Sequence, residues 1–102
     1  MEHKQASKEL ELFIDESIRV SNRKGYFPTT FIEMRSRHET IEAMTRLVRS
    51  GEIQSGFRKM KDKGILEWSI ESGVVKFRNE FLSEDVECAE WRLKMARENT
   101  DL

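Results

Sequence analysis

Cysteine and proline each occur once in this chain of 102 residues, glycine occurs five times, and no long apolar run is present. The single cysteine, Cys88, excludes an internal disulfide and a zinc site built on several cysteines, which suits the reducing cytosol. The scarcity of proline and glycine leaves little sequence for linkers or low-complexity tails. Because no apolar stretch approaches a membrane span and the N-terminus is too polar for a signal peptide, we expect a cytoplasmic protein.

Motifs that carry catalytic chemistry are also scarce. His38 is followed by Glu39, but no second histidine stands four residues later, as the zinc-protease motif requires. Cys88 lies beside the acids Glu87 and Glu90 rather than the positive charges that activate a catalytic cysteine. No glycine-rich phosphate loop ending in Lys-Ser or Lys-Thr occurs. We therefore expect a protein that is not an enzyme and has no cofactor, no metal site and no small-molecule substrate.

Charged residues, in contrast, are abundant. They make up 36% of the chain and hydrophobic residues make up 37%, a balance typical of a small globular protein with a crowded charged surface. Two independent cores would each be marginally stable at this chain length. We expect a single domain over residues 1–102, with frayed ends at residues 1–6 and 99–102.

The net charge of −1 hides an uneven distribution of charge along the chain. Basic and acidic side chains number two and five in residues 1–18, eleven and five in residues 19–63, and five and nine in residues 64–102. A basic middle segment therefore lies between acidic ends. This asymmetry indicates an anionic partner, and chance clustering on solvated helix faces is the alternative.

Apolar residues recur at steps of three and four along most of the chain, which predicts amphipathic helices. Gly25, Gly51 and Gly64 each follow such a segment and are typical helix terminators. Thr30 and Glu33 have the capping-box spacing at the start of the second helix. We predict a mainly α fold, a compact orthogonal bundle of five or six helices. The expected helices span residues 7–23, 30–37, 40–50, 52–63 and 84–98.

Residues 66–78 fit two structures. Apolar residues alternate from Leu66 to Ile70 as in a strand, and Gly73 would allow the turn of a β-hairpin. The same segment also has apolar residues at helical spacing, with Ser69 as the N-cap residue. The pattern alone does not decide between the helix and the hairpin.

The last predicted helix has two apolar stripes on roughly opposite faces. One stripe fits the core, and the other, formed by Cys88, Trp91 and Met95, needs cover from the N-terminal helix, a second copy of the chain or a partner protein. The stripe expected in the core consists of Val86, Ala89, Leu93 and Ala96.

About two thirds of the chain resembles a small domain that is common in bacterial proteins. The shared pattern reads P-T-x-F-x-x-M, A-x-x-x-L, S-G-F-x-x-L-x-x-x-G-x-L, L-x-[TS]-V-E and A-x-x-R-L, in that order. The domain has no established activity, so the resemblance transfers no functional residue. The matching positions are Pro28, Thr29, Phe31, Met34, Ala43, Leu47, Ser55, Gly56, Phe57, Gly64, Leu66, Ser69, Glu71, Ala89, Arg92 and Leu93.

The resemblance implies a short helix over residues 70–78. This chain departs from the pattern at Gly73, which costs a helix about 1 kcal/mol relative to alanine, and at His38 and Glu39, where glycines are usual. A hairpin at 66–78 would instead make the chain similar to a winged helix, with residues 52–63 as the recognition helix.

The basic middle segment indicates a nucleic-acid partner. The phosphates would be contacted by basic side chains of the two predicted helices at residues 40–50 and 52–63. The sequence pI of about 6.2 argues against this function, as does the lack of an evidently exposed aromatic residue among the basic ones. The alternative is a protein-interaction module or homodimer that uses Cys88, Trp91 and Met95. The candidate nucleic-acid-binding residues are Arg46, Arg49, Arg58, Lys59, Lys61 and Lys63.

Overall fold

The computed structural model describes residues 5–50 and 55–98. Within these ranges the chain forms five α-helices, two short 3-10 turns and no strand, which confirms the predicted mainly α fold. Two expectations fall largely outside the described residues: the frayed ends at 1–6 and 99–102, of which only residues 5 and 6 are described, and a helix boundary at 51–54. The helices are α1 (Lys8–Arg23), α2 (Thr29–Arg49), α3 (Ser55–Asp62), α4 (Ile70–Lys76) and α5 (Ser83–Glu98), and the turns are Leu66–Trp68 and Arg78–Glu80.

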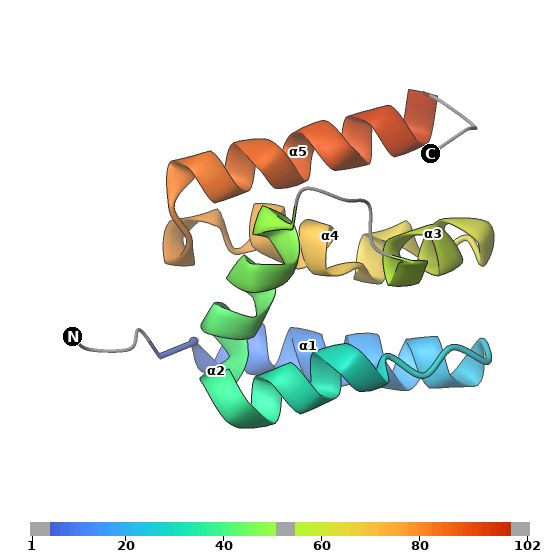
Figure 1. Ribbon diagram of the computed structural model, residues 1–102, viewed down its shortest axis with the longest axis horizontal. Coiled ribbons are helices and arrows are strands. Elements are labelled where there is room, and N and C mark those ends of the chain that lie inside the picture. The colour runs from blue at the N-terminus through green and yellow to red at the C-terminus, as the bar shows by residue number, and fades with distance from the viewer. Residues whose placement is uncertain (1–4, 51–54, 99–102) are drawn as a thin grey trace.

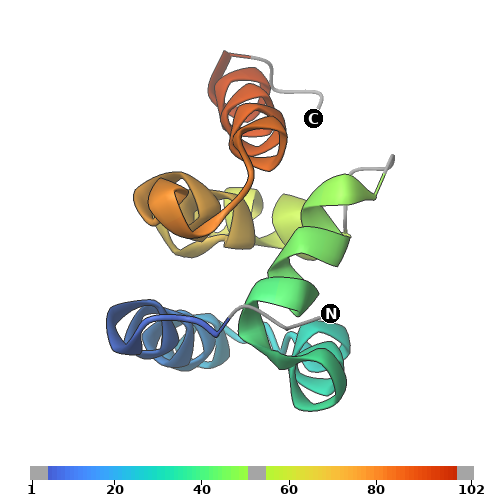
Figure 2. The ribbon, with the colours of Figure 1, turned by 90° about the vertical axis from the view of Figure 1, so that its left-hand side faces the viewer.

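The helices lie in three layers (Figure 1). One outer layer holds α1 and the first part of α2, the middle layer holds α3 and α4, and the other outer layer is α5. Figure 2 shows α2 rising from the first layer toward α5, which explains why α2 contacts both α4 and α5. Since α4 also packs against α1 and α5, this short helix occupies the centre of the molecule.

The predicted glycine terminators end α1 and α3. At the end of α1, Gly25 has a φ of 84°, and the N–H of Tyr26 donates to the carbonyl of Ser21 at 2.9 Å. This is the bonding of a Schellman cap, which needs a left-handed residue that glycine provides without strain. Gly64 ends α3 in the same way, with a φ of 72°. Both chain reversals were predictable from the sequence.

The N-terminal caps of α1 and α2 differ. The hydroxyl of Ser7 accepts a hydrogen bond from the N–H of Leu10 at 3.1 Å, as expected of an N-cap serine. The capping box predicted for Thr30 and Glu33 is wrong, because α2 begins at Thr29 and its N-cap residue is Pro28, which makes no side-chain capping bond. Thr30 therefore lies within the first turn and is too late in the chain to cap the helix.

A bend at Glu39 divides α2 into the two helices that the sequence predicted. Glu39 has φ 66° and ψ 173°, a conformation that glycine adopts far more readily than other residues. The helix stretches before and after the bend correspond to the predicted helices over residues 30–37 and 40–50. The position is one at which the resemblance leads us to expect glycine, and glutamate adopts the same backbone at a cost in strain.

Of the two structures that the sequence left open for residues 66–78, the helical one is confirmed: a 3-10 turn leads into α4, and no strand forms there. The hairpin alternative is therefore wrong. The side chain of Ser69 caps α4 by accepting a hydrogen bond from a backbone N–H in the first turn. A Cβ atom at Gly73 would lie only 2.9 Å from Met44 Cε and 3.0 Å from Phe13 Cε2. The glycine that weakens α4 as a helix therefore allows α1 and α2 to approach α4 closely.

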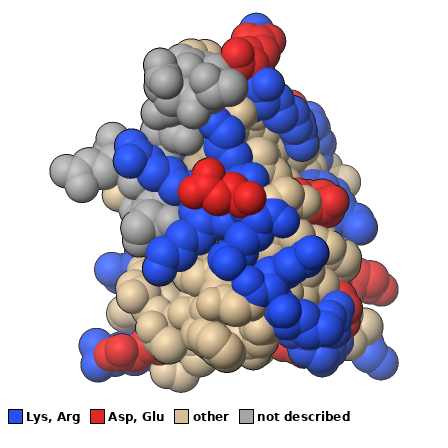
Figure 3. Space-filling view, turned by 90° about the vertical axis from the view of Figure 1, so that its right-hand side faces the viewer, with Lys and Arg blue, Asp and Glu red and all other residues tan. Residues whose placement is uncertain are grey.

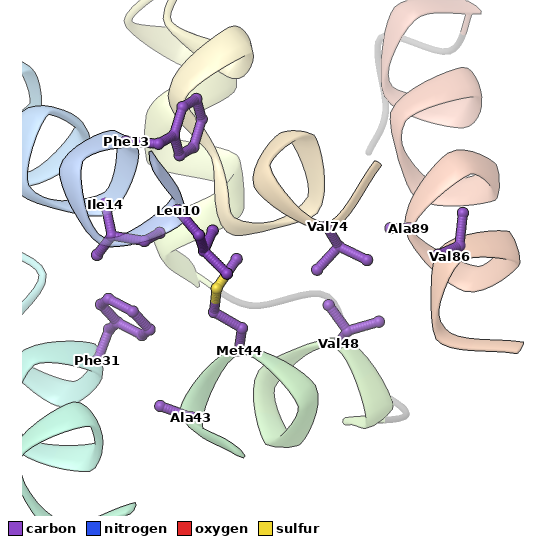
Figure 4. Close-up of a cluster of buried hydrophobic side chains, with 10 residues drawn as sticks. All are labelled: Leu10, Phe13, Ile14, Phe31, Ala43, Met44, Val48, Val74, Val86 and Ala89. Atoms are coloured by element: carbon purple, nitrogen blue, oxygen red, sulfur yellow. The ribbon is translucent and has the colours of Figure 1, made fainter. Parts of the chain in front are cut away.

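The core lies between α4 and the helices around it. Figure 4 shows that buried side chains from α1, α2, α4 and α5 converge there. The stripe of α5 predicted for the core is buried, as expected. The cluster comprises Leu10, Phe13, Ile14, Phe31, Ala43, Met44, Val48, Val74, Val86 and Ala89.

Candidate nucleic-acid interface

The two candidate arginines on α2 are paired with carboxylates. Arg46 Nε donates to Glu42 Oε2 at 2.8 Å on the same helix. Arg49 donates to both carboxylate oxygens of Asp85, at 2.9 and 3.0 Å. These hydrogen bonds raise the pKa of Arg49 above its ordinary value. Both arginines therefore have a structural partner that competes with an external anion.

The candidate cations on α3, and Lys63 directly after its last residue, are in a different situation. The side chains of Arg58, Lys59 and Lys63 are exposed and form no ion pair with any residue of the described ranges. Lys61 is half-buried and has an interaction of its own. Three of the four candidate cations on α3 and in the turn directly after it are therefore not neutralised within the part of the chain that the structure describes.

Two contacts bring α3 against the turn between α1 and α2. The ammonium of Lys59 lies 5.6 Å from the centroid of the Tyr26 ring, within cation–π range. The ammonium of Lys63 lies 3.9 Å from the position that a Cβ atom would take at Gly25. The basic residues of α3 are thus neighbours of those that end α1. We call this group the basic end, and it consists of Arg23, Lys24, Arg58, Lys59, Lys61 and Lys63.

Figure 3 views the molecule from the right-hand side of Figure 1, where α3 and the α1–α2 turn lie, and Lys and Arg side chains form a broad band across this face. Acidic side chains interrupt the band only locally. One nearby acid is Glu16, which lies 2.7 Å from Arg19 and 3.4 Å from Arg23. The hydrogen bond from Arg19 lowers the pKa of Glu16, so this carboxylate stays ionised and offsets part of the local positive charge.

A pocket of about 240 Å³ opens beside the basic end. It lies between α1, the α1–α2 turn and α3, and its lining includes Tyr26, Phe27, Phe57 and Lys59. Burial raises the pKa of the Tyr26 hydroxyl. The side chain of Phe27 is 62% exposed, so the expectation that no aromatic residue is exposed near the basic ones is wrong. The sequence did not reveal Phe27 because a turn residue has no periodic pattern.

Glu71 of α4, which also lines the pocket, forms a buried ion pair with Arg92 of α5. Their side chains are 4% and 6% exposed, and Arg92 donates to Glu71 Oε2 at 3.0 Å. Arg92 also donates to the carbonyls of Leu47 and Ser50 at the end of α2. Burial raises the pKa of Glu71, and the hydrogen bond from Arg92 opposes that shift. Both charged residues belong to the shared sequence pattern, but the pattern does not predict that they pair.

The three residues predicted as a protein interface differ in exposure. The thiol of Cys88 is directed toward α2 and donates to the carbonyl of Val48 at 3.4 Å. Met95 is half-buried, and Trp91 is 56% exposed. α2 therefore covers part of this stripe, and the N-terminal helix does not cover it at Cys88. Of the three side chains, Trp91 presents the largest apolar surface to solvent.

Across residues 5–50 and 55–98, no group of three His, Cys, Asp or Glu side chains is arranged to hold a metal ion. Over the same ranges, no helix has the length and apolar character needed to cross a membrane.

Comparison with known proteins gave no match to this chain among family models, curated proteins or solved structures. The resemblance to the bacterial domain and the looser one to winged-helix proteins stay predictions. The assignment of function therefore depends on the geometry and charge of the chain itself.

Proposed function

We propose that this protein binds nucleic acid through the basic end. The observation that carries the proposal is the contrast in ion pairing between α2 and α3. Arg46 and Arg49 are paired with carboxylates, whereas Arg58 and Lys59 on α3 and Lys63 directly after it are exposed and form no ion pair with a described residue. Unpaired cations gathered on one face are what an anionic polymer requires of a binding surface.

The overall charge of −1 does not conflict with this proposal. Exposed charges that lie farther apart than about 8 Å are largely screened at physiological salt, so a phosphate responds mainly to the charges nearest to it. Contacts with about four phosphates would give a slope near −3 when the logarithm of the affinity for a single strand is plotted against the logarithm of salt concentration. Binding should therefore be readily measured at low salt and fall steeply as salt is added.

The test is fluorescence anisotropy with labelled oligonucleotides, for the wild type and for the double variant Lys59→Glu/Lys63→Glu. We expect the variant to bind about a hundredfold more weakly, which corresponds to roughly 1.4 kcal/mol for each position. The matched control is Lys8→Glu/Arg37→Glu, which changes the net charge by the same amount. Lys8 begins α1, about 22 Å along the helix from Arg23 at the basic end. The control should keep its affinity.

Two results would overturn the proposal. The first is the absence of binding by the wild type at low salt. The second is equal loss of affinity in the two double variants, since this would attribute binding to net charge rather than to the basic end. Polyglutamate is added as a competitor, and displacement of the oligonucleotide at equal charge concentration would indicate an acidic protein partner instead.

A protein interface is the second candidate, and the exposure of Trp91 is the observation that favours it. Large aromatic side chains are frequent anchors in interfaces. Sedimentation of the wild type and of Trp91→Glu tests this function. Self-association of the wild type that the substitution abolishes would support it, and a monomeric wild type at high concentration would rule out a homodimer.

A further inference from the structure

We infer that the nucleic acid is single-stranded and that one unstacked base enters the pocket beside the basic end, against Tyr26 and Phe27. The inference rests on the proposed function and adds the class of ligand to it. It follows from the position of the pocket, from its aromatic lining and from its volume.

The pocket and the basic end share a residue. Lys59 lines the pocket, and its ammonium also lies 5.6 Å from the ring centroid of Tyr26. Lys63 is placed next to the same turn, near Gly25. A phosphate bound by these two lysines would therefore carry its own nucleoside to the mouth of the pocket. The ammonium groups neutralise the phosphates, and the adjacent pocket takes the base.

The two aromatic side chains at the pocket, Phe27 and Tyr26, differ in how much of each is exposed to solvent. Phe27 is 62% exposed, which leaves its ring available to a stacking partner, and Tyr26 is about half-buried and held by Lys59. Proteins that bind single strands combine a basic surface with aromatic rings on which bases stack, and such stacking tolerates any base. The α1–α2 turn provides this combination within a few residues.

The volume of the pocket limits what enters it. Pockets for drug-sized ligands measure roughly 300–1,000 Å³, and this one measures about 240 Å³. A single planar ring system fits that space better than a larger ligand does. A base inside a duplex is paired and stacked on both sides, so it would first have to be extruded at a cost in free energy. Single strands do not have that cost.

The experiment compares a labelled single strand with the duplex of the same sequence, at one low salt concentration, for the wild type, Phe27→Ala and Trp91→Ala. We expect the wild type to prefer the single strand by about tenfold. Phe27→Ala should lose that preference while it keeps its affinity for the duplex. Trp91→Ala is the matched control, because Trp91 is also an exposed aromatic residue, at 56% exposure, but lies on α5.

Gly56→Ala is a second variant that acts on the pocket from the opposite wall. A Cβ atom at this position would lie 2.2 Å from the hydroxyl oxygen of Tyr26, so the tyrosine ring must move. Because alanine favours the helical backbone of α3 more than glycine does, the helix itself is retained. We expect Gly56→Ala to weaken single-strand binding more than duplex binding, at an unchanged helix content by circular dichroism.

The outcomes separate the inference from the proposed function. Equal affinity for single strand and duplex, with Phe27→Ala behaving like Trp91→Ala, would overturn the base pocket and leave the basic end as the binding surface. Loss of all binding in Lys59→Glu/Lys63→Glu would then still support the proposed function. Absence of any binding by the wild type would overturn both.

Discussion

The arginines that hold the helices together and the cations of the basic end differ in what neutralises them. Arg92 is buried and forms an ion pair with Glu71, and Arg49 donates two hydrogen bonds to Asp85. Arg35 is half-buried and forms ion pairs with two acids of α1. The exposed cations of α3 have no such partner among the described residues. Positive charges therefore link helices to one another in the first group, whereas the exposed ones of α3 stay available to bind a partner.

This difference shows that charge type and spacing do not reveal the task of a residue. Arg46 and Arg58 both lie on amphipathic helices in the basic middle segment of the sequence, yet only Arg46 is paired. A cation whose carboxylate is buried should matter for stability, whereas an exposed and unpaired cation should matter only for binding. Substitutions of basic residues, ordered from the most buried ion pair to the exposed and unpaired cations, test this comparison.

The largest effect is expected for Arg92→Met. The substitution leaves the Glu71 carboxylate buried without a cation and removes two hydrogen bonds to the end of α2. We expect the free energy of unfolding at neutral pH to fall by about 3–5 kcal/mol, measured by urea denaturation. The double variant Glu71→Leu/Arg92→Met, which buries no charge, should recover part of that loss. A loss below about 1 kcal/mol in the single variant would contradict the structural role of this pair.

An intermediate effect is expected for Arg49→Ala. Arg49 itself is 53% exposed, but the Asp85 side chain that it neutralises is only 4% exposed. Removal of the arginine leaves that carboxylate without its cation, which should cost about 2 kcal/mol. Asp85→Asn should cost less, because it leaves only a solvated guanidinium behind. Equal costs for the two variants, or a loss of oligonucleotide binding in Arg49→Ala at retained stability, would break the comparison.

A smaller effect is expected from pH. Burial raises the pKa of Glu71 above its ordinary value of 4.5, so the folded protein holds this proton more tightly than the unfolded chain does. Stability contributed by this group is therefore greatest below pH 4.5 and declines as pH rises through the raised pKa. Relative to Glu71→Gln, the wild type should lose stability over that interval, as measured by urea denaturation at several pH values. A relative gain would show that Arg92 outweighs burial.

The smallest effect on stability is expected for Lys59→Gln/Lys63→Gln. Neither lysine pairs with a carboxylate of the described residues, and the cation–π contact of Lys59 with Tyr26 is exposed to solvent. We expect a change of less than about 1 kcal/mol in thermal denaturation, together with a marked loss of oligonucleotide affinity. A large fall in melting temperature would place these lysines in the structural group after all.

The sequence predicted the helices well because their determinants are local. Gly25 and Gly64 end α1 and α3, and Ser69 caps α4, each through contacts with residues a few positions away. The capping box at Thr30 failed because Pro28 already fixes the chain at the start of α2. The sequence did not exclude the hairpin because Gly73 disfavours a helix. The close packing of Phe13 and Met44 against Gly73 explains why glycine occurs at this position.

The candidate site was only partly predictable, for a related reason. The basic character of α3 is visible in its sequence, but the partner of Arg49 lies 36 residues away in α5, and helical spacing contains no information about it. The proximity of α3 to the α1–α2 turn depends in the same way on tertiary packing. Phe27 was missed because an exposed aromatic in a turn looks like any other turn residue in a sequence.

The bend at Glu39 has a consequence for the motions of the molecule. A non-glycine residue in this backbone conformation stores about 1–3 kcal/mol of strain, and the surrounding helix must hold it in place. Local opening begins where backbone bonds are fewest and strain is highest. Amide hydrogens next to the bend should therefore exchange with solvent faster than those in the middle of either half of α2, so the longest helix of this protein should open first near its own centre.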